Sequence, residues 1–441
     1  MSKQIQDNSR LYTFLKLFVD WSVKSSYRKY QVEGTEYLQK DSYSIWASNH
    51  TNALMDPMVL LSTSRQPKVF VARADIFKKK LAVRILSFLK VMPIYRIRDG
   101  IDAVKHNSES IEKATNVILD HVPFVIYPEA THRPKHSLLK LSKGIFHIAE
   151  SAIEKAKDGK PVYIQPIGIE YGDYFRFLST VLIRFGEPIN VTEYIKEHSD
   201  QPQPVIMLNM RELLTQKLAE LIVYIPDDED YDAVWEYVKL KAGNPDYYKK
   251  SLAEIERKEG KRLKGLLGIQ AVDKYAVQEA LDLKQSNPDL ARTLLKKVDE
   301  LRLWRIQNGV SARSIANEKS GWMLCLKFLF ALLGFPYYCF AAIASSIKWI
   351  PITFVLRGIK DDAFYNTTRF GTRLAMAIPA LPIWAAAYYL LMPWEYATIA
   401  FLLSIPSLRY LYNYGCYFRC LCSDIRWKIK KKRAPRMDGL L

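Results

Sequence analysis

Short apolar runs alternate with longer helical runs between residues 43 and 188, and this alternation is the feature that most limits the fold. Residues 69–72, 91–95 and 124–127 have the length and composition of buried strands. Residues 144–156 carry apolar side chains at helical spacing. The pattern predicts an α/β fold, a layered domain with a mostly parallel sheet whose strand ends carry the functional site.

A histidine and an aspartate lie on either side of the first bend of this region. His50 follows the strand-like run 43–47, and Asp56 precedes Pro57 at the start of a helical run. A separation of six residues is about 600° of helix, so the two side chains would have to meet across a bend. The Asp-Pro pair predicts that Asp56 is the N-cap and Pro57 the first helical residue. The imidazole could be a general base held by the carboxylate, but a loop histidine beside a helix cap gives the same pattern.

Further motifs follow this pair in a fixed order. The set is Asn49-His50 with Asp56, Pro93-Ile94-Tyr95-Arg96, Tyr127-Pro128-Glu129-Ala130-Thr131-His132-Arg133, and Ile164-Gln165-Pro166-Ile167-Gly168. Over about residues 30–190 the chain resembles the glycerophospholipid acyltransferases, which carry such blocks in this order. Ala130 stands where that family usually has glycine. Five residues between His50 and Asp56, and a histidine at 132, are similar to the branch that includes fungal glycerol-3-phosphate acyltransferases.

Acyl transfer from a thioester to an alcohol requires removal of the hydroxyl proton, and the motifs offer residues for each part of that reaction. We predict that His50 is the general base and that Asp56 stabilises the imidazolium, with the substrate itself as nucleophile. Guanidinium groups bind phosphate oxygens in pairs, so Arg96 and Arg133 are predicted phosphate clamps. For each of these two arginines the alternative is a solvated surface position. The arginine of the family motif could also align with His132 and not with Arg133. The full predicted substrate-binding set is Asn49, Arg96, Glu129, Thr131, Arg133 and Lys143.

No metal or other cofactor is expected. His132 and His136 have the spacing of a helical metal pair, but Pro134 between them disfavours the helical turn that would align them. All five cysteines lie in the last third of the chain, which excludes a cysteine nucleophile in the region of the motifs. Acyl-CoA or acyl carrier protein would enter as a co-substrate.

The formal charge of +18 implies an anionic partner, either nucleic acid or an anionic membrane surface. The densest basic run, residues 426–436, directly follows apolar segments, and that position favours anionic membrane lipids. We therefore expect no nucleic acid. An amphipathic helix over about residues 11–24 fits contact with a membrane or with the domain.

Two uncharged runs in the last third of the chain are long enough to span a bilayer. Residues 328–347 give twenty uncharged positions and residues 374–394 give twenty-one. The connection 348–373 has five basic residues against two acidic ones, and the tail 426–441 has seven against one. Because basic loops stay in the cytoplasm, the sequence predicts hairpins that return to the same side, with the catalytic domain on the cytoplasmic face.

These patterns divide the chain into four parts. Residues 1–29 would form an N-terminal amphipathic helix, 30–225 the acyltransferase domain, 226–318 a charged helical insert and 319–441 membrane-embedded helices with a basic tail. The resemblance implies acyl transfer to 1-acyl-glycerol-3-phosphate (lysophosphatidic acid), which makes phosphatidic acid in phospholipid biosynthesis. Transfer to glycerol-3-phosphate is the close alternative, and a non-catalytic lipid-binding protein is the remote one.

Overall fold

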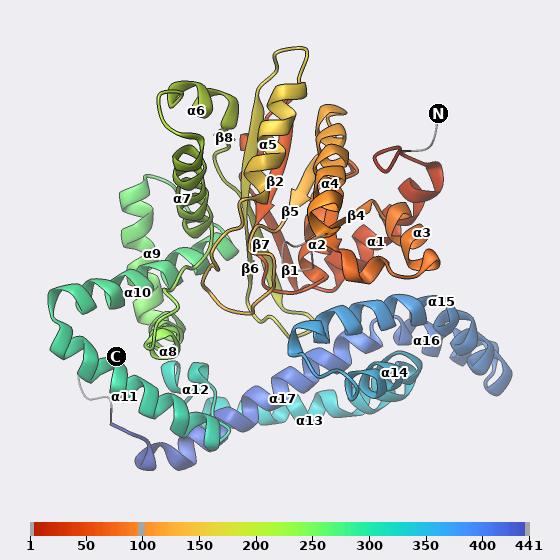
Figure 1. Cartoon of the computed structure of the whole chain (residues 1–441). Helices are drawn as coiled ribbons and strands as arrows, with labels where there is room; N and C mark the ends of the chain where they lie inside the picture. The colour runs from red at the N-terminus through yellow and green to blue at the C-terminus, as the bar shows by residue number, and fades with distance from the viewer. Residues whose placement is uncertain (1–3, 96–101, 437–441) are drawn as a thin grey trace. The chain divides into compact units, whose positions relative to one another are not determined.

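The computed structural model describes residues 4–95 and 102–436. The chain divides into two compact units, Met1–Ile222 and Val223–Leu441, and each is considered by itself. The first unit contains the motifs and the sheet (Figure 1). The predicted division into four parts stays a prediction.

The first unit is built on a mixed sheet that has eight strands among the described residues, in the order β1-β7-β6-β2-β5-β3-β4 with β8 beside β6. β2 lies parallel to both β5 and β6, and β3 lies parallel to both β4 and β5, whereas β7 and β8 run antiparallel to β6. The strands are β1 (Lys29–Glu33), β2 (Tyr43–Ser48), β3 (Val69–Arg73), β4 (Val91–Ile94), β5 (Phe124–Ile126), β6 (Val162–Tyr171), β7 (Thr180–Phe185) and β8 (Ile189–Asn190).

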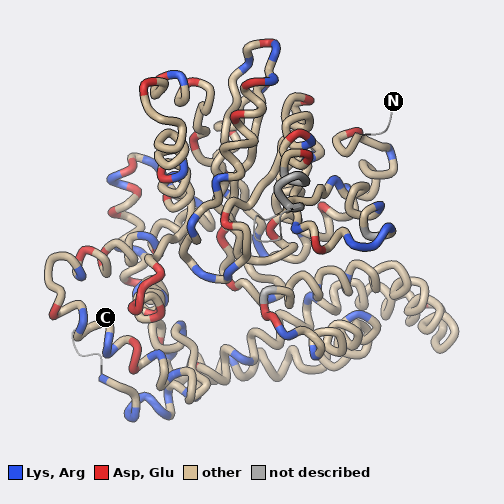
Figure 2. The backbone as a smooth tube through the Cα atoms, in the orientation of Figure 1, with Lys and Arg blue, Asp and Glu red and all other residues tan. Residues whose placement is uncertain are grey.

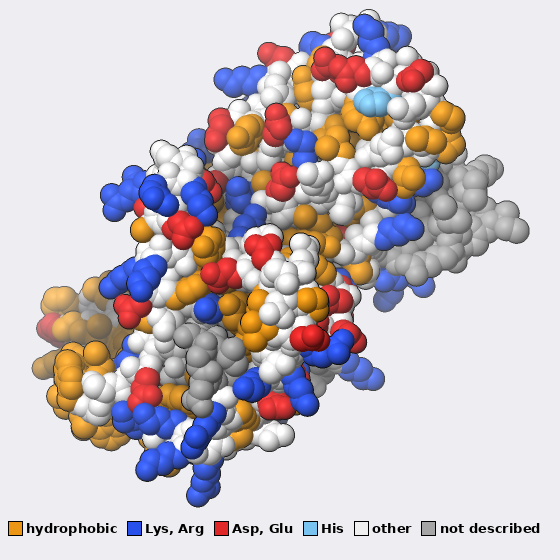
Figure 3. Space-filling view, turned by 90° about the vertical axis from the view of Figure 1, so that its left-hand side faces the viewer, with side chains coloured by type: hydrophobic (Ala, Val, Ile, Leu, Met, Phe, Trp, Pro, Cys, Tyr) orange, Lys and Arg blue, Asp and Glu red, His pale blue; other side chains and the backbone are white. Residues whose placement is uncertain are grey.

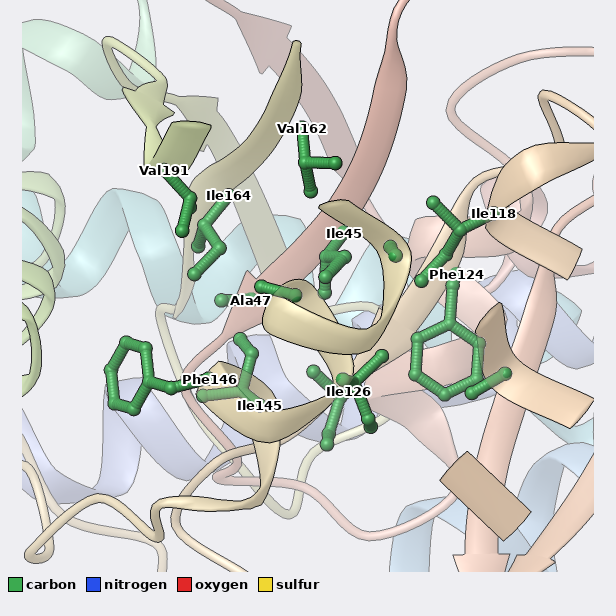
Figure 4. Close-up of a cluster of buried hydrophobic side chains, with 14 of the residues drawn as sticks. Ile45, Ala47, Ile118, Phe124, Ile126, Ile145, Phe146, Val162, Ile164 and Val191 are labelled. Atoms are coloured by element: carbon green, nitrogen blue, oxygen red, sulfur yellow. The ribbon is translucent and has the colours of Figure 1, made fainter. Parts of the chain in front are cut away.

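The helices of this unit cover the sheet and bury its apolar side chains. They are α1 (Arg10–Ser25), α2 (Met55–Leu61), α3 (Lys80–Phe88), α4 (Asp102–Leu119), α5 (Gly144–Lys155), α6 (Val191–Glu197) and α7 (Gln203–Leu221). α4 and α5 lie side by side over the sheet in Figure 1. Their apolar faces meet the central strands in one buried cluster (Figure 4), where Ile45, Phe124 and Ile145 are fully buried. The predicted α/β class with a mostly parallel sheet is confirmed.

The second unit begins with helices whose surfaces carry many charges. They are α8 (Tyr231–Gly243), α9 (Pro245–Glu259), α10 (Leu266–Ser286), α11 (Pro288–Gln307) and α12 (Ala312–Ala316). They enclose a separate apolar core that includes Val238, Ala276 and Val298. Within that core the fully buried Glu236 binds Arg305 and Lys239. The face in Figure 3 mixes acidic and basic side chains, as solvated helical surfaces do.

In the part of the chain that the structure describes, the rest of the second unit consists of four apolar helices that carry few charges in Figure 2 and of a fifth, α17, that is basic toward its end. They are α13 (Gly321–Ala344), α14 (Ser346–Leu356), α15 (Tyr365–Leu391), α16 (Trp394–Ser404) and α17 (Ser407–Lys430). Among the described residues, α13 and α15 are long and apolar enough to cross a membrane. Only 6% of the most apolar window of α13 and 11% of that of α15 are buried, so neither resembles the core helix of a water-soluble domain.

Hydrogen bonds join α13 to α17 along much of their length. The hydroxyls of Tyr410, Tyr414 and Tyr417 donate to main-chain carbonyls of α13 at 2.9, 2.7 and 2.8 Å. Gly334 permits this approach, because a Cβ there would lie 2.6 Å from the Tyr410 hydroxyl. Side-chain hydrogen bonds and small residues are the contacts that hold helices together where surrounding lipid removes the hydrophobic driving force.

Candidate active site

His50 and Asp56 meet in the bend between β2 and α2. The Nδ1 atom of His50 lies 2.7 Å from Oδ2 of Asp56. The aspartate is fully buried, whereas the histidine side chain retains 18% exposure. A buried carboxylate against one ring nitrogen fixes the orientation of the imidazole and leaves the opposite nitrogen, Nε2, for the substrate.

The predicted helix start at Asp56 is wrong by two residues. α2 begins at Met55 with Leu54 in the N-cap position, so Asp56 lies in the first helical turn and Pro57 follows within it. Asp56 instead accepts the main-chain N–H groups of Thr51 and Asn52 at 2.7 and 2.8 Å. Pairing with His50 therefore depends on a tight loop that folds back onto the carboxylate.

Tyr171, the last residue of β6, completes the surroundings of Asp56. Its hydroxyl donates to Oδ1 at 2.8 Å, while Oδ2 receives His50 and the loop. Burial, followed by the charge of Asp56, raises the pKa of Tyr171, so the hydroxyl keeps its proton and remains a donor. Each oxygen of the buried carboxylate is thus hydrogen-bonded, as a stable buried charge requires.

Glu129 holds the backbone on which His50 sits. Its two carboxylate oxygens accept the N–H groups of His50 and Leu139, each at 2.8 Å. The side chain is 6% exposed. Burial raises the pKa of Glu129, and the two backbone donors oppose that shift. The predicted substrate-binding residue Glu129 therefore ties the third motif to the start of the His50 loop.

Asn49 forms a second link, between the end of β2 and β6. Its amide donates to the Ile169 carbonyl at 3.0 Å and accepts the Ile169 N–H at 2.7 Å. Asn49 is 2% exposed, and both groups of its amide are engaged by the main chain. In this structure the predicted substrate-binding residue Asn49 fixes His50 at the sheet edge.

Residues 130–133 pass beside His50. Ala130 has φ +58°, a left-handed conformation that glycine adopts with less strain, in agreement with the glycine usual at this motif position. The Arg133 N–H donates to the His50 carbonyl at 3.0 Å, and its guanidinium donates to Ser137 at 2.6 Å. Thr131 is exposed in the same turn. The structure thus brings Arg133 to the His50 and Asp56 pair, and Thr131 lies two residues before it in the chain.

Two further basic residues, Arg96 and Lys143, were predicted to bind substrate. Arg96 lies outside the described residues. Lys143 is exposed in the N-cap position of α5, and no described contact joins it to His50.

Aromatic rings surround His50. The ring of Tyr127 stacks on the imidazole with centroids 4.4 Å apart, and His132 approaches it edge-on at 5.5 Å. His136 is directed elsewhere, since its Nδ1 lies 2.8 Å from Glu170. Among the described residues, no group of three or more His, Cys, Asp or Glu side chains could hold a metal ion.

Sequence reasoning missed Tyr171 and the stacking role of Tyr127. Tyr127 precedes Pro128-Glu129 directly, so its place after a strand was a usable signal. Tyr171 is 115 residues from Asp56, and only the pairing of β2 with β6 brings the ends of those strands together. No local pattern marks such a residue.

Part of the chain is similar to known proteins. Residues 29–170 match the family model described as Acyltransferase. No curated protein matches the chain. Among solved structures, the 1-acyl-sn-glycerophosphate (LPA) acyltransferase PlsC from Thermotoga maritima is similar at 19% identity and a TM-score of 0.35, over 49% of this chain and 83% of that one.

The region of the family match begins at β1 and ends within β6, and it contains the His50 and Asp56 pair, Glu129 and Arg133. It therefore covers the motif residues of the site, and Tyr171 lies one residue beyond its end. The prediction of an acyltransferase is confirmed, because residues 29–170 match the Acyltransferase family model.

Proposed function

We propose that this protein is a membrane-bound O-acyltransferase that moves a fatty acyl group from a thioester donor to the free hydroxyl of 1-acyl-glycerol-3-phosphate. The observation that carries the proposal is the contact of His50 Nδ1 with the buried Asp56 at 2.7 Å. It presents Nε2 of a partly exposed imidazole as a base. The donor would be acyl-CoA or acyl carrier protein, and the product phosphatidic acid.

The reaction needs one proton to move twice. Nε2 of His50 takes the proton of the acceptor hydroxyl as its oxygen attacks the thioester carbonyl, and Asp56 stabilises the imidazolium. When the carbon–sulfur bond breaks, the imidazolium returns that proton to the leaving thiolate. The ester forms directly on the acceptor, so no acyl group is attached to the protein.

Arg133 supports a phosphate-bearing acceptor. Its main-chain N–H donates to the His50 carbonyl, so the residue adjoins the His50 loop, and its side chain is half-buried. A guanidinium can bind two phosphate oxygens at once, and such pairs are stronger than neutral hydrogen bonds. Arg96 and Lys143 remain proposed additions to the same phosphate site.

Membrane attachment is supported by α13 and α15, which are apolar, long and largely unburied. An acceptor and a product with acyl chains stay in the bilayer, so an enzyme held there meets both. We place the catalytic domain on the cytoplasmic side, where acyl-CoA and acyl carrier protein are found.

The test is acyl transfer by the full-length, detergent-solubilised protein, with 1-acyl-glycerol-3-phosphate and glycerol-3-phosphate offered in parallel. Each acceptor is paired with acyl-CoA and then with acyl carrier protein. Faster turnover of the 1-acyl acceptor supports the proposal. A preference for glycerol-3-phosphate would make the product lysophosphatidic acid, in line with the five-residue gap between His50 and Asp56. Absence of transfer from either donor would reject both.

A further inference from the structure

A cavity in the second unit lies between α14 and α17. Its volume is about 380 Å³, within the range of small-ligand sites. Its walls are formed by Trp349, Thr353, Leu411, Tyr412, Gly415 and Arg419. Two aromatic rings, two hydroxyl groups and a cation thus line one space, and none of these six residues is acidic.

Further cations lie around this cavity. The charges of Arg369 and Arg373 on α15 act on the Tyr412 hydroxyl, which belongs to the cavity wall. Arg373 also acts on the ammonium of Lys348, the neighbour of Trp349, and Lys348 is half-buried. These positive charges add to that of Arg419 and favour an anionic ligand over a neutral one.

The position of this cluster in the fold indicates the type of anion. Arg369 and Arg373 lie near the beginning of α15, one of the two helices long and apolar enough to cross a membrane. A basic pocket near the end of such a helix is suited to the head group of an anionic lipid. The aromatic walls then offer apolar surface to the glycerol and the upper acyl chain.

We propose that this cavity binds the phosphate head group of an anionic phospholipid, with Arg419 as the principal ligand and Tyr412 as a hydroxyl donor. The site consists of residues of the second unit, whereas His50 belongs to the first. It goes beyond the proposed acyl transfer, and it would hold a bilayer lipid against the helical region whether or not that lipid reacts.

Two substitutions address charge and volume separately. Arg419→Gln removes the cation on the wall, and because Arg419 is exposed the fold should tolerate the change. Gly415→Leu fills the space without altering charge. The fold should tolerate it, because an added Cβ there meets no heavy atom within 4 Å. Leucine also favours a helix more than glycine does.

Each variant has a matched control. Arg409→Gln changes another exposed arginine of α17 that does not line the cavity. Gly371→Leu changes a glycine of α15 that is likewise open, two residues from Arg369 and from Arg373 and so on the opposite side of the helix.

The experiment measures binding of fluorescent phosphatidylglycerol to the full-length protein in detergent, because this lipid is neither the proposed acceptor nor the product. Arg419→Gln and Gly415→Leu should each weaken binding about tenfold, as expected for loss of a hydrogen bond to a charged group or of the space itself. The two controls should bind as the native protein does. Folding is checked by circular dichroism and gel filtration.

Three results would overturn the proposal. The first is equal binding by the native protein and both cavity variants. The second is equal competition by phosphatidylcholine, which would show apolar adhesion without recognition of net charge. The third is complete displacement of the lipid by inorganic phosphate, which would make the cavity a site for a soluble anion.

Discussion

At the scale of single residues, the hydrogen bonds of Asp56 determine how His50 can act. One carboxylate oxygen holds the imidazole and two main-chain N–H groups, and the other receives Tyr171. The carboxylate therefore cannot rotate without losing several bonds at once. An imidazole fixed in this way is already oriented when the substrate arrives, which is how a positioned base contributes to rate.

Replacing Tyr171 with phenylalanine tests this arrangement. Tyr171→Phe removes the donor to Oδ1 of Asp56 and leaves the ring, so packing should persist. We expect kcat to fall about tenfold with little change in KM, because a hydrogen bond to a charged group contributes about 1.5 kcal/mol. Steady-state kinetics with the preferred acceptor gives both values. A change confined to KM would mean that Tyr171 acts on substrate binding instead.

Lys68 is a fully buried lysine beside α2. Its ammonium donates to Leu61, Ser64 and Gln66 at 3.3, 3.0 and 3.3 Å and lies 5.3 Å from the Trp46 ring centroid, contacts that favour its charge. Burial, followed by the charge of Lys16, opposes them and lowers the pKa of Lys68 to about 7. Stability should therefore depend on pH through this residue.

The sign of that dependence follows from proton counts. Between pH 7 and the ordinary lysine value of 10.5, the folded chain has lost the Lys68 proton while the unfolded chain still binds it. The free energy of unfolding then rises with pH across this window. Thermal unfolding of the native protein should show a greater rise in Tm from pH 7 to 9 than that of Lys68→Met. Equal pH slopes would contradict the lowered pKa.

At the scale of elements, β6 helps to fix the position of His50. Gly168 lies where α7 ends against this strand, and a Cβ there would come within 2.6 Å of the Leu221 side chain and 2.8 Å of its carbonyl oxygen. The next residue, Ile169, binds Asn49. Close approach of helix and strand at this point thus lies one residue from the link that fixes His50.

Gly168→Ala should destabilise the protein by about 1–3 kcal/mol, the usual cost of overpacking a core. Activity should fall with it, because displaced β6 would pull Ile169 from Asn49. The matched control is Gly144→Ala, at the first residue of α5, where an added Cβ meets nothing within 4 Å. Thermal unfolding compares the two variants. Similar unfolding temperatures for both would show that the α7 contact adjusts without cost.

Some elements of the fold could be predicted from the sequence and others could not. The strand-like runs and the motif spacing were sufficient for the parallel part of the sheet and for the His50 and Asp56 pair, because both signals are local. The antiparallel strands β7 and β8 were not foreseen, and Asp56 was wrongly placed at the N-cap. The second error arose because Asp56 accepts the N–H groups of the loop before it, and the helix begins two residues earlier than the Asp-Pro signal suggests.

At the scale of the whole molecule, the distribution of charge makes a prediction about topology. The stretch 348–373, which includes most of α14, the link to α15 and the start of α15, and the tail 426–441 are both strongly basic, so both should lie on the cytoplasmic side. Single cysteines at Lys360 and Lys432, introduced after replacing the native five, should be labelled from the same side of sealed vesicles. Labelling from opposite sides would reject the hairpin arrangement.

The central claim, that His50 is the base for acyl transfer, is tested most directly by His50→Ala in the full-length protein. The control is His147→Ala, an exposed histidine of α5 outside the pair. We predict that His50→Ala lowers acyl transfer on the order of a hundredfold or more, as loss of a general base should, while His147→Ala leaves it unchanged. Native rates in His50→Ala would contradict the account and reduce the contact with Asp56 to a structural one.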